Sequence, residues 1–293
     1  MFHFALLVVV LNRRDNNRGM LHVWLDCVRR AGIRNFFIVA LDAELHEHLT
    51  NVRDPPVPSF FYDMNADPIM ALHAADNHGI SSLKFRLLGR MLRQGYTVLL
   101  SDVDVCTTQD PFGRDAKTKR PLLYRDSDVE GLSDGFDPNV AYGKIKGFDD
   151  PTMGWARYAQ GVYHMVFNSG LFLVRPRRCT VELMQRVTRA LEKRKEWDQS
   201  RWNMELFYLT HNDYKNPGCS TRVMDIHTFV NSKVMFKTLR NKKKHATPAM
   251  VHINYHPDKW ERLKAVRDFY FGERDAASRK RLMAFPGGSE PGT

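Results

Sequence analysis

The sequence lacks the features that mark several common protein classes. It has only 4 cysteines in 293 residues, and none of them forms a CxxC pair, which excludes a common zinc-site pattern and a disulfide framework. One disulfide bridge is compatible with this number, and the sequence does not indicate which two cysteines would form it. An arginine-rich arm is also missing, so nucleic-acid binding is only weakly indicated.

Long hydrophobic runs are missing as well. The longest run, FALLVVVL (4–11), has eight residues and is too short to span a bilayer. It follows no basic region and precedes no small-residue cleavage site, so it does not have the form of a signal peptide. We interpret it as a buried strand of a parallel sheet that is covered on both faces.

Positive charge is in excess. Lysine and arginine number 44 against 33 aspartates and glutamates, which gives a formal net charge of +11. This balance favours an anionic partner, such as a nucleotide, a polyphosphate, nucleic acid or an anionic membrane surface. The content of 43% hydrophobic and 11% aromatic residues is enough for a sizeable core and argues against disorder.

Alternating strand and helix patterns predict an open α/β sheet, because the chain opens with a β-α-β unit. The segment 113–160 is rich in Gly, Asp and Pro and predicts long loops. The other expected elements are a strand at 2–12, a helix at 19–32, a strand at 35–42, a helix at 80–95, a strand at 96–105, a strand pair or one strand bent at Asn168–Gly170 within 163–176, a helix at 180–198 and a strand at 249–256.

Asp102 and Asp104 end the apolar run in YTVLLSDVDV (96–105). In a strand, residues two apart point to the same side, so the two carboxylates are expected to project together. Ligands of open α/β sheets bind beyond the carboxyl ends of the strands, and paired carboxylates hold magnesium or manganese together with substrate phosphates. The alternative is that both are turn residues that close a buried strand.

A second acidic pattern, DSDVEGLSDGFD (126–137), has the spacing of an EF-hand calcium loop. Ser133 occupies the position that should be apolar, Asp137 the position that should be Glu, and the flanks do not have a helical pattern. We therefore favour a flexible acidic loop over an active site rather than a calcium site.

A set of motifs that spans nearly the whole chain resembles a known family. Together, and in order, they are similar to the nucleotide-diphospho-sugar transferases of glycosyltransferase family 77, and most of all to its plant-type extensin arabinosyltransferases, the reduced residual arabinose group. The motifs are LKFRLL, VLLSDVDV, RDSDVEGLSDG, MGWARY, FNSGLFLVRP, EWDQSRWNMELFY, FVNSKVMFKT and VHINYHPDKWERLKAV.

The resemblance implies an α/β fold of the GT-A type, with an open mixed sheet and helices on both faces. It implies a manganese-dependent site, with magnesium as a possible substitute, and a UDP-sugar donor. The expected reaction is retaining transfer of L-arabinofuranose from UDP-arabinofuranose to an arabinosylated, hydroxyproline-rich extensin-type glycoprotein. The alternatives are a xylosyl- or galactosyltransferase that acts on a cell-wall polysaccharide and a catalytically silent scaffold or lectin-like protein.

On this resemblance, Asp104 is the main metal ligand, and Asp102 serves the metal and the ribose side of the donor. His252 corresponds to the late third ligand, with His256 as the alternative. Lys259 is expected to neutralise the leaving diphosphate.

Further donor contacts are also implied. Lys84 and Arg86 flank Phe85 on a helix and cannot share one face, so one or both are expected to contact the donor. Asp198 is expected on the sugar face opposite the leaving group, either as a nucleophile or as a stabiliser of positive charge. The remaining residues implied by the resemblance are Asn12 in the base-contacting loop, Asn168 and Ser169 in a sugar-contacting turn, and Gln199 beside Asp198.

One domain is expected. It covers 1–285, with a nucleotide-binding half at 1–112 and a half for donor sugar and acceptor at 113–285, followed by a tail at 286–293. The sequence departs from the family at Arg13–Arg14, where relatives carry small or polar residues. The Golgi membrane anchor and stem of the relatives are absent from this chain, and a location in the Golgi lumen is implied by the family alone.

Overall fold

The structure is a computed structural model, and it describes most of the chain. The described residues are 5–12, 19–52, 56–64, 77–142, 167–208, 210, 212–213, 215–216, 218–239, 246–272 and 274–287. The departure at Arg13–Arg14 and the MGWARY motif (153–158) lie outside them.

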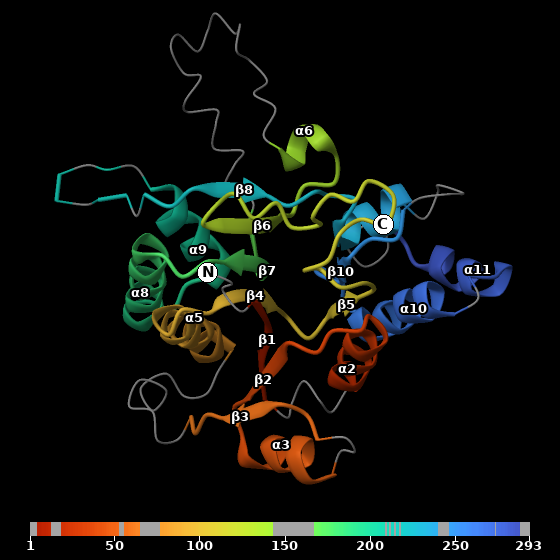
Figure 1. The fold of residues 1–293 in the computed structure, drawn as a ribbon, viewed down its shortest axis with the longest axis horizontal. Helices are drawn as coiled ribbons and strands as arrows, with labels where there is room; N and C mark the ends of the chain where they lie inside the picture. Colours follow the sequence, from red (N-terminus) through yellow and green to blue (C-terminus); the bar gives the residue numbers. More distant parts are fainter. Residues whose placement is uncertain are drawn as a thin grey trace, which may run out of the picture.

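A mixed sheet of seven strands forms the centre of the molecule, in the order β3-β2-β1-β4-β7-β6-β8 (Figure 1). The strands β3, β2, β1 and β4 are parallel to one another, whereas β7 is antiparallel to both β4 and β6. The sheet therefore confirms the α/β expectation. Its strands are β1 (Ala5–Leu11), β2 (Phe36–Ala40), β3 (Ser59–Phe61), β4 (Thr97–Ser101), β6 (Val129–Ser133), β7 (Phe167–Val174) and β8 (Thr221–Val223).

A smaller sheet lies beside the large one, in the order β5-β10-β9. Its central strand is antiparallel to β5 and parallel to β9. The strands are β5 (Val105–Thr107), β9 (Phe229–Asn231) and β10 (Met250–His252).

Helices cover both faces of the large sheet (Figure 1). The helices of the described part of the chain are α2 (Met20–Arg30), α3 (Ala43–Glu47), α5 (Asn77–Arg93), α6 (Pro138–Ala141), α8 (Arg178–Lys193), α9 (Asp198–Phe207), α10 (Lys259–Phe271) and α11 (Ala276–Ala284), with π-helical segments η1 (His48–Val52) and η4 (Val234–Leu239). Among the described residues, no helix combines the length and the apolar character needed to cross a membrane.

The alternation of side chains along β1 explains the two apolar layers. Leu7, Val9 and Leu11 point into a core shared with α2 and β5, and Val8 points into the core beneath α5, α8 and α9. Both layers are closed to water, as the continuous apolar run predicts for a parallel strand. The buried strand predicted for this run is thus confirmed.

An aromatic cluster fixes α5 and α9 against β7. The ring of Phe172 stacks on that of Trp202 at 4.7 Å, and Phe85 lies 5.6 Å from Trp202. All three side chains are fully buried. Because Phe85 points into the core, its neighbour Lys84 is held at one defined place beside the end of the sheet.

The segment 113–160 is not loop throughout. Its residues Val129–Ser133 form β6 inside the large sheet, so the flexible acidic loop was wrong for this part, and the EF-hand loop that the sequence analysis disfavoured does not form there either. Glu130 is fully buried, where its carboxylate accepts hydrogen bonds from the backbone N–H groups of Tyr124 and Arg125 and pairs with Arg175 at 2.9 Å. This carboxylate supports a turn and is not available as a calcium ligand.

A bulge interrupts the pairing of β6 with β7. Gly131 pairs with Phe172, but Ser133 pairs with Phe167, so β7 has extra residues at Asn168–Gly170. This confirms the prediction of one strand with a bend at this point.

Candidate active site

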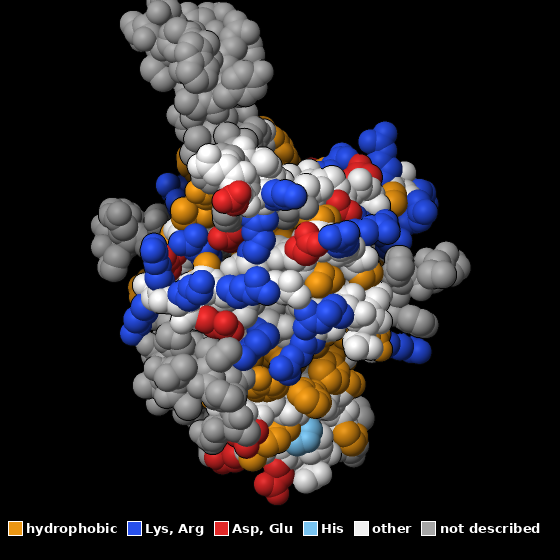
Figure 2. All heavy atoms as spheres, turned by 90° about the vertical axis from the view of Figure 1, so that its left-hand side faces the viewer, with side chains coloured by type: hydrophobic (Ala, Val, Ile, Leu, Met, Phe, Trp, Pro, Cys, Tyr) orange, Lys and Arg blue, Asp and Glu red, His pale blue; other side chains and the backbone are white. Residues whose placement is uncertain are grey.

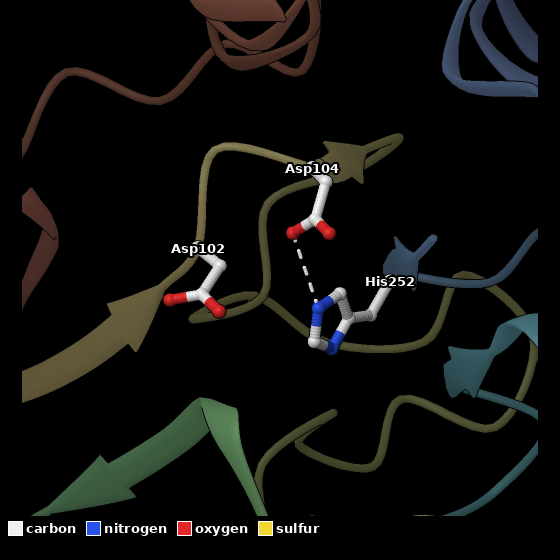
Figure 3. Close-up of side chains that lie close together, drawn as sticks. All are labelled: Asp102, Asp104 and His252. Atoms are coloured by element: carbon white, nitrogen blue, oxygen red, sulfur yellow. Dashed lines mark ion pairs between the residues drawn. The ribbon is translucent and has the colours of Figure 1, made fainter. Parts of the chain in front are cut away.

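Two carboxylates and an imidazole converge where the large and small sheets meet. One ligand atom from each of Asp102, Asp104 and His252 lies within 4.8 Å of the others (Figure 3). His252 ends β10, while Asp102 and Asp104 lie in the turn between β4 and β5. The two carboxylates do lie close together, as predicted, but they do not share a strand, because β4 ends at Ser101. A turn aims them at the same point.

The electrostatics of this group suit a cation. Burial would raise the pKa of Asp104, but His252 and Lys259 outweigh it, so the pKa lies well below its ordinary value and the carboxylate stays charged. The His252 Nε2 atom lies 3.1 Å from Asp104 Oδ1, and its Nδ1 atom has no hydrogen-bond partner among the described residues. Carboxylate oxygen and imidazole nitrogen are both good ligands of manganese. The residues present therefore fit a divalent cation.

Gly170 on β7 leaves the room that this group needs. A Cβ atom at this position would press against Asp102 Oδ2 and would lie 2.7 Å from His252 Cε1. The carbonyl of Gly170 accepts a hydrogen bond of 2.7 Å from the Asp102 N–H. The bulge in β7 thus both positions Asp102 and keeps space open beside it.

A polar cleft of about 460 Å³ opens beside the three residues. It collects side chains from both sheets and from α5, α9 and α10. The predicted residues that line it are Lys84, Asp102, Asp104, Asn168, Ser169, Asp198, Gln199, His252 and Lys259.

Lys84 and Asp198 form an ion pair inside this cleft, with Nζ and Oδ2 2.5 Å apart. Burial would raise the pKa of Asp198, but the ammonium of Lys84 outweighs it and keeps the carboxylate ionised. Burial would lower the pKa of Lys84, but Asp198 and Asp102 outweigh it and keep the ammonium charged. Asp198 begins α9, a helix separate from α8, whereas the sequence predicted one helix over 180–198.

Arg86 does not reach the cleft. It lies 4.0 Å from Glu192 on α8 and borders a different hollow between α5 and α8. Two residues along a helix correspond to a rotation of about 200°, so only one of Lys84 and Arg86 can face the site. The alternative that assigns the donor contact to both residues is therefore not borne out by the geometry.

Two further expectations differ from the structure. Asn12 follows β1 directly, but it is not among the residues that line the cleft. His256 is buried beside Phe236 and is not a member of the ligand group, so the alternative third ligand was wrong.

Asp134 is a site residue that the sequence analysis missed. Its carboxylate accepts hydrogen bonds from Asn168 Nδ2 at 3.0 Å, Gln199 Nε2 at 2.6 Å, Asn254 Nδ2 at 3.0 Å and the hydroxyl of Tyr255. One acceptor thus orients four polar side chains from three separate segments. The signal was present in the SDG sequence after β6, where the sequence analysis expected a flexible acidic loop over an active site but named no single residue as a site residue.

Two further side chains of the cleft, those of Lys259 and Gln199, are held in place by polar neighbours. Lys259 Nζ lies 2.7 Å from Asp104 Oδ2, at the first turn of α10. The Gln199 carbonyl oxygen accepts hydrogen bonds from Asn168 Nδ2 at 3.3 Å and from the Ser169 N–H at 3.5 Å. The amide group of Gln199 is therefore fixed in one orientation between Asp134 and the bulge of β7.

Two aromatic side chains stand at the mouth of the cleft. Trp197 is 57% exposed and precedes Asp198, and Tyr255 is 37% exposed and follows Asn254. Large exposed aromatic groups beside a polar cleft are typical of binding surfaces.

Basic side chains are numerous on another face. Figure 2 shows many Lys and Arg side chains on the side of the molecule that carries α8. A second cavity of about 370 Å³ lies there, and it is lined by Arg186, Arg189, Ala190, Lys193, Arg194, Arg201 and Glu205.

Sequence comparison agrees with this site. A profile of the nucleotide-diphospho-sugar transferases matches residues 31–265, which include Asp102, Asp104, Asp198 and His252. The chain belongs to the nucleotide-diphospho-sugar transferase family. The resemblance noted in the sequence is thereby confirmed at the level of the family.

Two curated relatives of this nucleotide-diphospho-sugar transferase come from Arabidopsis thaliana. The chain is 43% identical to Arabinosyltransferase RRA2 over 97% of its length, and 41% identical to Arabinosyltransferase RRA1 over 94%. It covers 63% and 66% of these two proteins, so it spans slightly less than two thirds of their length.

Solved structures support the fold of this transferase. The bifunctional glycosyltransferase WbbM matches 97% of this chain and 52% of its own, with a TM-score of 0.53 and 16% identity. An active-site mutant of LgtC matches 89% of this chain and 94% of its own, with a TM-score of 0.50 and 15% identity. The predicted GT-A fold is therefore confirmed.

Proposed function

We propose that this chain is the catalytic part of a retaining, metal-dependent glycosyltransferase that moves L-arabinofuranose from UDP-arabinofuranose. The proposed acceptor is an arabinosylated, hydroxyproline-rich glycoprotein of the extensin type, and the proposed location is the Golgi lumen. The observation that carries the proposal is the convergence of Asp102, Asp104 and His252 at the head of a polar cleft. The 43% identity to an arabinosyltransferase supports the choice of sugar.

The metal ligands in this proposal are Asp102, Asp104 and His252. A Mn²⁺ ion held by them, or Mg²⁺ in its place, would supply positive charge to the diphosphate as UDP leaves. Lys259, which lies 2.7 Å from Asp104, adds a protein cation at the same end of the cleft. Electrostatic stabilisation of the leaving group makes a general acid unnecessary there.

On the sugar side, Asp198 supplies a fixed negative charge. Its pairing with Lys84 keeps it ionised, so it can stabilise positive charge that develops at the anomeric carbon. Because one of its oxygens already contacts Lys84, we favour this stabilising role over covalent attack. Gln199 and Asn168, both fixed by Asp134, are then placed to orient the hydroxyl groups of the sugar.

The acceptor side of the proposal uses the exposed aromatic residues Trp197 and Tyr255. Aromatic rings combine an apolar face with little loss of side-chain entropy, which suits the binding of furanose and proline-type rings. These two residues flank the cleft next to Asp198 and Asn254, so an acceptor that lies on them meets the donor sugar.

Calorimetric titration of UDP into the purified protein, with Mn²⁺ and then with EDTA, tests the donor site. Asp104→Ala is expected to abolish the metal-dependent heat, whereas Asp126→Ala, which removes an exposed carboxylate, should leave it intact. Transfer assays with UDP-arabinofuranose, UDP-xylose and UDP-galactose onto an arabinosylated hydroxyproline peptide then identify the sugar. If only UDP-xylose or UDP-galactose is turned over, that sugar replaces arabinose in the proposal. If UDP does not bind at all, a silent scaffold is favoured instead.

A further inference from the structure

The cysteines of this chain lie in two pairs. Cys27 on α2 and Cys106 on β5 are 79 positions apart in the sequence, yet their Sγ atoms are 2.7 Å apart. Both side chains are fully buried. They are free thiols in the structure, and their sulfur atoms face each other directly across the contact between α2 and β5.

The second pair is Cys179, at the start of α8, and Cys219, just before β8. Asp128 joins the two segments, because its Oδ2 atom contacts Cys179 Sγ at 3.7 Å and accepts a hydrogen bond of 2.9 Å from the Ser220 N–H. Burial and the neighbouring Cys179 thiol raise the pKa of Cys219, which is consistent with the two thiols lying close together beside Asp128. All 4 cysteines of the chain are thus matched two by two, although they lie far apart in the sequence.

Other roles for these thiols do not fit. The group of metal-ligating side chains found among the described residues contains no cysteine, so a metal held by thiolates has no support there. The thiols of Cys27 and Cys106 are buried in direct contact, so their sulfur atoms need only a short approach to form a disulfide bond.

We propose that Cys27 and Cys106 form a disulfide bond in the mature protein, and that Cys179 and Cys219 form a second one. This goes beyond the proposed transfer reaction and does not depend on the donor sugar. It requires folding in an oxidising compartment, which the proposed lumenal location provides.

The bonds form by thiol–disulfide exchange with a disulfide-bearing oxidant, such as oxidised glutathione or a disulfide oxidoreductase. The thiolate of one cysteine attacks the oxidant and releases one thiol, and the thiolate of its partner then attacks the mixed disulfide and releases the second. The oxidant leaves as two thiols, which carry the two protons of the cysteines. The first bridge forms before α2 closes over β5, because the folded protein shields both sulfur atoms from any oxidant.

The first bridge also affects the active site. Cys106 lies on β5 two residues beyond Asp104, so a covalent link to α2 fixes the start of this strand and the turn that carries both carboxylates. The second pair lies beside β8, an edge strand of the large sheet, and neither of its cysteines lines the cleft. Loss of the first bridge should affect the active site and loss of the second should not, so variants of the two pairs are controls for each other.

The test is mass spectrometry of the full chain secreted from a eukaryotic host. The protein is unfolded in denaturant with N-ethylmaleimide and no reductant, and then digested. We expect no alkylated cysteine and two cross-linked peptides, which join Cys27 to Cys106 and Cys179 to Cys219. Alkylation of Cys27 and Cys106, or cross-links in another combination, would overturn the assignment.

Paired variants add a functional readout. Cys27→Ala with Cys106→Ala is expected to lower the thermal midpoint and to weaken metal-dependent UDP binding. Cys179→Ala with Cys219→Ala should lower the midpoint without a change in UDP affinity. An unchanged midpoint in both variants would contradict the proposal, and the mass spectrum of the wild-type protein decides it even if one variant fails to fold.

Discussion

Replacement of Gly170 by alanine gives a sharp test of the metal site, because it adds one methyl group and removes no ligand. The new Cβ would lie 2.7 Å from His252 Cε1 and 2.8 Å from Asp102 Cγ, whereas ordinary contacts begin at 3.4 Å. His252 must therefore retreat by about 0.7 Å, and Asp102 by more than this, because its Oδ2 atom is the atom nearest to the new Cβ. The backbone of Gly170 is in an ordinary strand conformation, so alanine adds no backbone strain of its own.

The expected magnitude follows from the tolerance of metal coordination. Divalent cations demand ligand distances that are fixed to a few tenths of an ångström, and a misplacement of about 1 Å costs on the order of 100-fold. We expect the Kd of UDP in the presence of Mn²⁺ to rise by about 100-fold, which corresponds to about 2.7 kcal/mol. Overpacking should lower the free energy of unfolding by about 1–3 kcal/mol.

Calorimetry of UDP binding at saturating Mn²⁺, together with urea denaturation, measures both effects. Gly89→Ala is the matched control, since it adds the same methyl group on α5, where the Cβ meets Met184 at 3.2 Å, away from the cleft. If Gly170→Ala bound Mn²⁺ and UDP as the wild type does, the three residues would not form the metal site. Equal losses in both variants would point to general destabilisation instead.

Three other predictions concern charge, pH and the acceptor. Lys84→Met leaves its partner carboxylate buried without a cation and should lower the free energy of unfolding by about 3–5 kcal/mol in urea denaturation. Arg86→Met, away from the cleft, should lower it by clearly less. Equal losses in the two variants would contradict the ion-pair argument. Burial, together with Arg262, lowers the pKa of His256 to about 4. Between pH 6.5 and 4 the unfolded chain therefore binds a proton that the folded protein does not. The free energy of unfolding should decrease by up to about 3 kcal/mol as the pH is lowered through this range. His256→Gln should flatten this dependence, and an unchanged slope would refute it. Trp197→Ala should raise KM for the acceptor peptide by about 2- to 10-fold, with the UDP affinity unchanged in calorimetry; a loss of UDP affinity would place this residue in the donor site.

The sequence predicted those parts of the structure that depend on local pattern. The apolar run at 4–11 and the stripe of the helix at 80–95 specify β1 and α5, because burial of a periodic apolar face has few solutions. The family motifs identified residues that lie far apart in the chain, such as Asp104, Asp198 and His252, and the fold brings them into one cleft.

The parts that were missed depend on non-local contacts. The sequence left open whether Asp102 and Asp104 lie in a strand or in a turn, and the pairing of β5 with β10 shows that the chain turns there. Asp134 was not singled out as a site residue because its partners come from other segments and have no signature in its own sequence. The choice between Lys84 and Arg86 required the structure, since the apolar stripe shows which side of the helix faces the core but not which flank lies beside the cleft.

The three proposed metal ligands are divided between two sheets, so a bound ion would couple the small sheet to the large one. Asp102 follows the last residue of β4 in the large sheet, whereas Asp104 precedes β5 and His252 ends β10 in the small one. An ion bound by all three would have to dissociate before the small sheet could open by itself. Local opening of β5 and β10 should then become rarer by the factor 1 + [ion]/Kd, so the exchange of their backbone amide hydrogens with deuterium would report occupancy of the site in a protein that is not turning over.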